Sequence, residues 1–144
     1  MAAHAFHWAD APRALPALRR ALAPGGALTV LWNVRDEEAS EVLALTRREI
    51  EATAPGFDEG YRDRDWAAVL ASTGDFGDVA LDEERHVIPM SAERYAELWR
   101  SHHLLKRAIG ETGLERLLAA IEAHLRGADV EVPYVCRAWT ARAL

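Results

Sequence analysis

Cysteine is scarce in this sequence: Cys136 stands alone, so no disulfide can form within the chain. No apolar run is long enough to cross a bilayer, and the first residues lack the pattern of a secretion signal. These absences predict a soluble cytoplasmic protein with no membrane contact.

Basic residues are also in deficit, with 17 Lys and Arg against 23 Asp and Glu and a net charge of -6. They are scattered, which removes the electrostatic footprint of a nucleic-acid partner. The six histidines lack the cysteine or carboxylate spacing of a zinc centre, so we predict no metal site.

The chain does have enough apolar sequence for a core. It holds 144 residues, 50% of them hydrophobic, which suits one compact domain over residues 1–144. The other residues are organised around a stretch in which Pro24 and Gly25 reverse the chain before an apolar run, Ala27–Trp32. That run predicts a strand covered on both faces, as in a parallel sheet packed between helices.

Polar residues follow this strand directly: Asn33, Arg35 and Asp36. In open α/β sheets, ligands bind just outside the carboxyl ends of the strands. These three side chains are therefore candidate ligand-binding residues. Before the strand, Met1–Trp8 resembles the end of another strand and Asp10–Leu22 an amphipathic helix, which together predict a parallel crossover.

Helical spacing and strand-like patterns divide the rest of the chain. We expect Val79–Met90 to be an outer strand with a turn or bulge, and Val130–Ala141 to lie near an edge because of Pro133. Helices are predicted over Glu37–Ala54, over Asp65–Ser72 with Asp63 or Asp65 near its cap, from Ser91 through Trp99, and from a capping box at Thr112–Glu115 through Leu125.

Three segments, AAHAFHWAD, LAPGGALTVLWNVRDE and VEVPYVCRAWTA, resemble the carboxyl-terminal half of class I S-adenosylmethionine-dependent methyltransferases. The resemblance is to the small-molecule group that includes trans-aconitate methyltransferases. It implies an α/β, partial Rossmann-like fold, with half of a mixed sheet in which strands four, five, seven and six lie side by side. It also implies helical substrate-lid segments at about residues 37–60 and 91–127.

The same resemblance implies S-adenosylmethionine as cofactor, but its main binding motifs do not occur here. The family uses a glycine-rich turn after its first strand and an acidic residue after its second. Gly25 and Gly26 precede a strand instead. We therefore expect a truncated gene product, one part of a split enzyme, or a descendant with a new role, and no cofactor-binding residue is assigned.

His7 and Trp8 correspond to the family's segment at the methyl-transfer pocket. The imidazole of His7 could orient or deprotonate an acceptor, and the indole of Trp8 could wall the cavity. The alternative is that His7 caps a strand end and Trp8 fills core. Similarly, Asn33, Arg35 and Asp36 could bind a carboxylate, Arg35 bidentately, or could form an ordinary surface loop.

His102 and His103 fall on a helix that the family uses in its substrate lid, although packed or solvent-facing histidines are the alternative. The aromatic residues Trp66, Tyr95, Trp99 and Trp139 are expected in the core rather than around a cofactor.

Two functions are consistent with these features. The first is the acceptor pocket of a small-molecule methyltransferase, with the donor-binding half absent from this chain. The second is a non-catalytic module that binds small molecules or oligomerises. Because strand four would have an open edge, we expect a homodimer or a complex with a complementary amino-terminal half.

Overall fold

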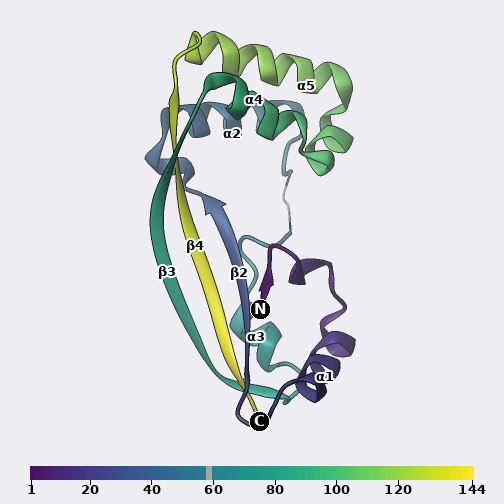
Figure 1. The fold of residues 1–144 in the computed structure, drawn as a ribbon. Helices are drawn as coiled ribbons and strands as arrows, with labels where there is room; N and C mark the ends of the chain where they lie inside the picture. Colours follow the sequence, from purple (N-terminus) through teal and green to yellow (C-terminus); the bar gives the residue numbers. More distant parts are fainter. Residues whose placement is uncertain (58–59) are drawn as a thin grey trace. The chain divides into compact units, whose positions relative to one another are not determined.

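The computed structural model describes residues 1–57 and 60–144 (Figure 1). Residues 58 and 59, at the end of the predicted lid segment 37–60, lie outside the described residues. The chain packs as two compact units. The first unit contains residues 1–34, 60–85 and 135–144, and the second unit contains residues 35–57 and 86–134.

A four-stranded sheet has the order β1-β2-β4-β3, built from β1 (Ala2–Ala3), β2 (Ala27–Arg35), β3 (Phe76–Met90) and β4 (Val130–Ala143). β1 is parallel to β2, with Ala2 opposite Val30. In the strand numbering of the methyltransferases that the sequence resembles, this is the order four, five, seven, six. The mixed α/β class and the strand order expected from the sequence are therefore confirmed.

Two backbone hydrogen bonds fix the direction of β4 against β2. The amide of Ala143 donates to the carbonyl of Gly26, and the amide of Asp36 donates to the carbonyl of Pro133, so the pairing runs antiparallel. The expectation that Pro133 places this strand near an edge is wrong, because β4 lies between β2 and β3. Proline has no backbone N–H to donate. At Pro133 this nitrogen faces Asp36, one residue beyond the end of β2, so the ladder between β2 and β4 loses no hydrogen bond.

β3 is an edge strand, as predicted for an outer position. Its middle, residues 80–85, is exposed. Asp78 near its start has a φ of 48°, a left-handed conformation that interrupts the regular pleat. The acidic side chains of this segment discourage edge-to-edge pairing with another strand.

The first unit adds a 3-10 helix η1 (Phe6–Trp8), α1 (Ala11–Ala21) and α3 (Trp66–Ala71). The segment Met1–Trp8 is thus mostly turn, not strand. β2 alternates between buried Leu28, Val30 and Trp32 and half-buried neighbours, so the expectation of full coverage on both faces is wrong. The core of this unit consists of Phe6, Ala11, Leu15, Leu28, Val30, Trp32, Trp66, Leu70, Phe76 and Ala141.

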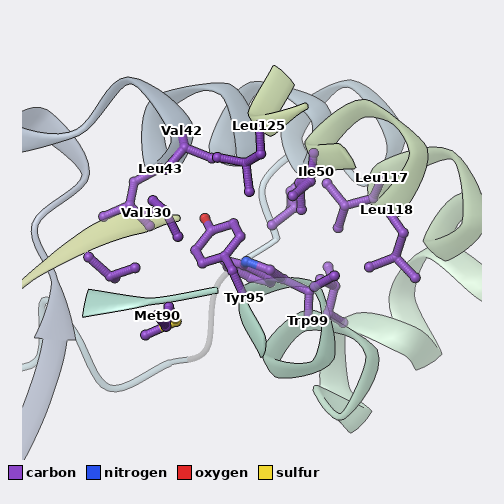
Figure 2. Packing of buried hydrophobic residues seen from close by; sticks show 14 of the residues in the cluster. Val42, Leu43, Ile50, Met90, Tyr95, Trp99, Leu117, Leu118, Leu125 and Val130 are labelled. Atoms are coloured by element: carbon purple, nitrogen blue, oxygen red, sulfur yellow. The ribbon is translucent and has the colours of Figure 1, made fainter. Parts of the chain in front are cut away.

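The second unit contains a 3-10 helix η2 (Glu37–Ala39), α2 (Glu41–Thr53), α4 (Ala92–Arg100) and α5 (His103–Leu125). These helices confirm the helices predicted over Glu37–Ala54 and from Ser91 through Trp99, and α5 includes the helix predicted to run through Leu125. Figure 2 shows Tyr95 and Trp99 among side chains from α2, α5 and the ends of β3 and β4. The labelled aliphatic members are Val42, Leu43, Ile50, Met90, Leu117, Leu118, Leu125 and Val130.

α5 is interrupted at Gly110, whose φ of 68° and ψ of 178° are not helical. Lys106 and Glu111 form an ion pair of 2.7 Å on either side of this break. The predicted helix start at the Thr112–Glu115 capping box is therefore misplaced by a few residues. The break depends on a glycine because that region of φ and ψ is accessible to essentially no other residue.

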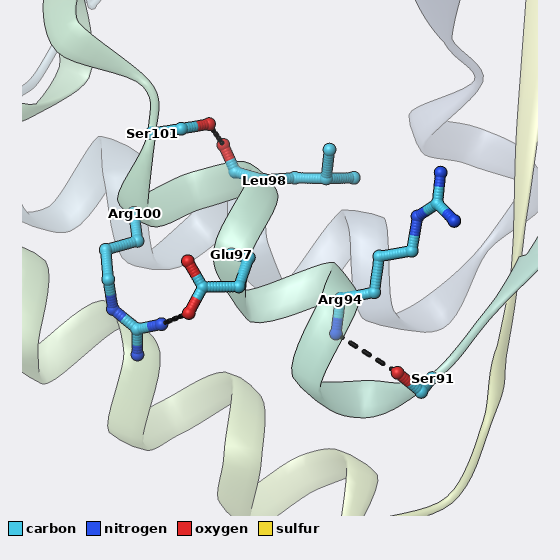
Figure 3. A network of polar contacts seen from close by, with 6 residues as sticks. All are labelled: Ser91, Arg94, Glu97, Leu98, Arg100 and Ser101. Carbon is cyan, nitrogen blue, oxygen red and sulfur yellow. Dashed lines mark hydrogen bonds and ion pairs between the residues drawn. The ribbon is translucent and has the colours of Figure 1, made fainter.

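Two helix caps predicted from the sequence are confirmed. The Asp65 carboxylate accepts from the amide of Ala68 at 2.9 Å and caps α3, as predicted. Ser91 caps α4 by accepting from the amide of Arg94 at 3.2 Å (Figure 3). Among the described residues, no helix combines the length and apolar character needed to cross a membrane.

Candidate functional site

His7 lies in η1 of the first unit and contacts Trp32, a buried residue of β2. The indole N–H of Trp32 donates to His7 Nδ1 at 3.2 Å. An indole nitrogen can only donate, so Nδ1 must carry a lone pair. In the neutral imidazole, the proton is therefore on Nε2. The geometry selects one tautomer of the predicted catalytic residue.

Trp8, the next residue, is 62% exposed. The alternative interpretation that Trp8 fills core is therefore wrong. Its ring lies 4.8 Å from the His7 ring, centre to centre. Of the three residues in η1, Phe6 is the one that is buried in the core. A large aromatic surface next to His7 is thus accessible to solvent.

Further aromatic rings, which were not predicted as site residues, extend from His7 into the first unit. Tyr61 lies 4.8 Å from His7 and 6.2 Å from Trp32. Trp32 stacks on Trp66 with ring centres 4.0 Å apart. In the sequence, the aromatic residues between positions 57 and 66 are the one sign of this group. Which distant rings contact one another is decided by the tertiary structure.

Asn33 lies within β2, because the strand continues through Arg35 and does not end at Trp32 as expected. Its backbone amide donates to Nε2 of His4 at 2.7 Å. His4 has a φ of 49°, a left-handed conformation that is uncommon for a residue other than glycine. His4 therefore turns the chain after β1 and uses its ring to bind the neighbouring strand.

Arg35 belongs to the second unit, where its guanidinium carbon lies 4.4 Å from the centre of the Trp99 ring. A cation on an indole face contributes about 2 kcal/mol when both groups are desolvated. The Nε of Arg35 is buried, and no described residue accepts a hydrogen bond from it. No described carboxylate forms an ion pair with Arg35. A buried donor without an acceptor typically costs about 1–3 kcal/mol.

Trp99 also contacts His102, one of the predicted lid residues. The two rings are parallel within 6° and their centres lie 6.0 Å apart. His102 Nδ1 accepts from the amide of Leu105 at 3.3 Å, so His102 caps α5. His103 is exposed at the first position of α5. Of the two alternatives to a lid role, His102 is the packed histidine and His103 is the solvent-facing one.

A pair of buried hydroxyl groups lies beside this cluster. Thr46 donates to the carbonyl of Val42 at 2.7 Å, which leaves its oxygen to accept from the Tyr95 hydroxyl at 3.0 Å. Burial raises the pKa of Tyr95 above 10.0, while the Thr46 hydrogen bond, Trp99 and the Arg35 charge lower it. The phenol thus stays protonated at physiological pH.

The predicted site residues divide between the two units. His7, Trp8 and Asn33 belong to the first unit, and Arg35, Asp36, His102 and His103 to the second. Within the first unit, His7 and Trp8 contact each other. Within the second, Trp99 contacts both Arg35 and His102, while the Asp36 amide bonds to Pro133. Trp99 is buried, as expected, and its position between Arg35 and His102 has no signal in the sequence.

No group of three or more His, Cys, Asp or Glu side chains suited to a metal ion occurs in the part of the chain that the structure describes. A groove of about 380 Å³ lies on the second unit, between α4 and the end of α5. Its lining consists of Ala92, Glu93, Ala96, Glu97, Arg100, Glu122 and Gly127. Glu97 and Arg100 form an ion pair there (Figure 3).

No protein-family model matches this sequence. Over 45 residues, the chain is 47% identical to proteins named uncharacterized methyltransferase from Mycobacterium bovis and from two strains of Mycobacterium tuberculosis, CDC 1551 and H37Rv. The match covers 31% of this chain and 18% of each relative. This similarity supports a relationship to methyltransferases for the matched segment.

Two solved structures show a weaker likeness. A phosphoethanolamine N-methyltransferase 2 of Haemonchus contortus, in complex with phosphomonomethylethanolamine and S-adenosylhomocysteine, has a TM-score of 0.37 and 13% identity, covering 95% of this chain and 30% of that one. A candidate methyltransferase of Bacillus halodurans has a TM-score of 0.41 and 14% identity, covering 97% and 61%. The α/β class follows from the sheet and helices of this chain itself.

Proposed function

We propose that residues 1–144 form the acceptor-binding part of an S-adenosylmethionine-dependent small-molecule methyltransferase. The observation that carries the proposal is the 47% identity over 45 residues to proteins named methyltransferase. The strand order β1-β2-β4-β3 supports it, since it is the order that the family resemblance implies. In this proposal, the residues that bind the methyl donor lie outside this chain.

Methyl transfer requires little covalent help from a protein, because the sulfonium of the donor is already activated. The protein mainly aligns the acceptor with the methyl group and excludes water. His7 suits an orienting role, since Nε2–H can donate to an oxygen of the acceptor. Removing a proton would require the opposite tautomer, which breaks the bond from Trp32 to Nδ1. Trp8 would supply an apolar wall beside it.

The second unit would contribute acceptor recognition. Arg35 presents a guanidinium without a partner carboxylate among the described residues, and Asp36 follows it directly in the sequence. His102 and His103 begin α5, in the segment that the family uses as a substrate lid.

The partner proposal concerns β1. β1 lies at the edge of the sheet, where Ala2 and Ala3 pair with β2, so its outer edge offers backbone groups to another polypeptide. We propose that a complementary amino-terminal half, or a second copy of the chain, adds to this edge. Light scattering at high concentration tests the assembly, and a strictly monomeric mass with and without the amino-terminal half contradicts it.

The test of the function is reconstitution. The chain would be co-expressed with the amino-terminal half of a matching methyltransferase, and the complex titrated by calorimetry with S-adenosylmethionine and S-adenosylhomocysteine. Transfer of labelled methyl groups to a panel of small acceptors would follow. His7→Gln is expected to lower transfer about tenfold, the effect of losing one orienting hydrogen bond of about 1.4 kcal/mol. His124→Gln, on an exposed helical position, serves as the matched control.

A folded complex that neither binds the donor nor methylates any acceptor overturns the methyltransferase proposal. That result would favour the alternative, a non-catalytic module that binds small molecules or oligomerises. Its motivation is that both units have cores of their own, while the sequence carries no glycine-rich donor motif. Methylation by the chain itself would exclude this alternative.

A further inference from the structure

The guanidinium of Arg35 is a charged group in an unusual position. Its only described neighbours in electrostatic contact are the face of the Trp99 ring, at 4.4 Å, and the neutral Tyr95 phenol. Its Nε is buried with no acceptor among the described residues, although Arg35 as a whole is half-buried and so reaches solvent. A partly desolvated cation without a counter-charge is unfavourable, unless a ligand supplies the charge.

We propose that Arg35, seated on Trp99, forms a binding site for a small oxyanion, a carboxylate or a phosphate monoester. Nε is the nitrogen of Arg35 that is buried without an acceptor among the described residues, so the two terminal N–H groups, one on each Nη, form the fork that matches two oxygens of either group. Trp99 acts as a positioning residue in this site, because it holds the planar guanidinium without neutralising its charge.

Packing around Trp99 explains how the ring can hold this position. Trp99 is buried, lies edge-on to Tyr95 at 6.3 Å, and stacks parallel to His102. Tyr95 is itself tied to Thr46 on α2. The indole face beneath Arg35 is therefore fixed by contacts from two helices, and the oxyanion site is preorganised rather than formed on binding.

The assignment of this oxyanion as part of the methyl acceptor rests on the proposed function. Binding itself requires no methyl donor, so the two can fail separately. Loss of methyl transfer with oxyanion binding retained would remove only the enzymatic proposal. Loss of oxyanion binding with methyl transfer retained would remove only this site.

The experiment uses the 144-residue chain in ¹H–¹⁵N NMR, observing arginine Nε–H resonances. Arg35→Lys identifies the signal of Arg35 by its disappearance. Sodium succinate and sodium phosphate are titrated separately, with sodium chloride at equal ionic strength. We expect dissociation constants of about 1 mM or tighter for at least one oxyanion, with a shifted Arg35 signal. Preference for succinate or phosphate then identifies which of the two chemistries the site takes.

The variants separate recognition from packing. Arg35→Met is expected to weaken binding at least about tenfold, and Arg35→Lys is not expected to restore it fully. Trp99→Phe, which keeps a buried ring, should weaken binding about threefold, and Trp99→Leu about fivefold. Arg116→Met is the control, since Arg116 is an exposed arginine of α5 in the same unit.

Three results would overturn the proposal: no binding of either oxyanion, binding that Arg35→Met leaves unchanged, or chloride shifts equal to those of succinate and phosphate. Urea unfolding establishes which variants are folded. If Trp99→Phe is folded and binds with the dissociation constant of the wild type, Trp99 only fills the core. That outcome removes its positioning role.

Discussion

The indole N–H of Trp32 donates to Nδ1 of His7, and this one bond decides which nitrogen of His7 carries the proton. We predict that His7 is present as the Nε2–H tautomer at neutral charge. In Trp32→Phe the donor is absent, so both tautomers should be populated. Long-range ¹H–¹⁵N NMR of the imidazole nitrogens distinguishes the two forms.

The control for this prediction is His86, whose ring stacks on that of Tyr134 with the ring centres 5.6 Å apart. Its tautomer populations should be the same in the wild type and in Trp32→Phe. A His7 ring that already exchanges between tautomers in the wild type would show that the Trp32 bond does not fix it.

The order of the sheet could be predicted because it depends on segments with recognisable sequences. The apolar run after Gly26 and the late run from Val130 identified two neighbouring strands through family resemblance. The local rule for Pro133 gave the opposite answer, an edge position. The rule failed because the backbone nitrogen of Pro133 faces a residue beyond the end of the neighbouring strand. The absent N–H therefore removes no hydrogen bond from the sheet.

The candidate site was predictable only in part. Arg35 could be singled out as a polar residue near the end of an apolar strand. The indole that lies against its guanidinium belongs to Trp99, a residue 64 positions further along the chain. The lack of a carboxylate partner among the described residues is also visible only in the folded structure. Trp99 carries the same helical spacing as any core residue, so sequence alone gave it no other role.

Tyr95 predicts a loss of stability in alkali. Burial raises the pKa of its phenol above 10.0, the value expected in the unfolded chain. Above pH 10.0, the unfolded state loses this proton before the folded state does, so the free energy of unfolding falls as pH rises. Tyr95→Phe should remove this contribution, which urea unfolding between pH 8 and 11 would measure.

At neutral pH, Tyr95→Phe should cost about 1 kcal/mol, because the hydrogen bond to Thr46 is lost. Thr46→Val is the informative companion, since it leaves the buried phenol without its acceptor and should cost more. If Tyr95→Phe keeps the full alkaline slope of the wild type, then other groups cause that slope.

The backbone conformation of Gly110 predicts whether replacing it by alanine raises or lowers the free energy of unfolding. In a regular helix, replacing glycine by alanine stabilises a protein by about 0.4–1 kcal/mol. Gly110 has a φ of 68° and a ψ of 178°, so a Cβ there is strained even though no atom lies within 4 Å of it. We expect Gly110→Ala to destabilise the chain by about 1–3 kcal/mol in urea unfolding. A stabilised variant would show that α5 is continuous.

Ser91 and Ser101 allow a comparison at the two ends of α4 (Figure 3). The Ser91 hydroxyl accepts from the amide of Arg94, which otherwise has no partner in the first turn. Ser101 donates to the carbonyl of Leu98. Ser91→Ala should therefore cost about 1 kcal/mol of unfolding free energy, the typical value for an N-cap. Ser101→Ala should cost less, because its loss exposes a carbonyl that water can reach. Equal losses in urea unfolding would show that α4 does not depend on its cap.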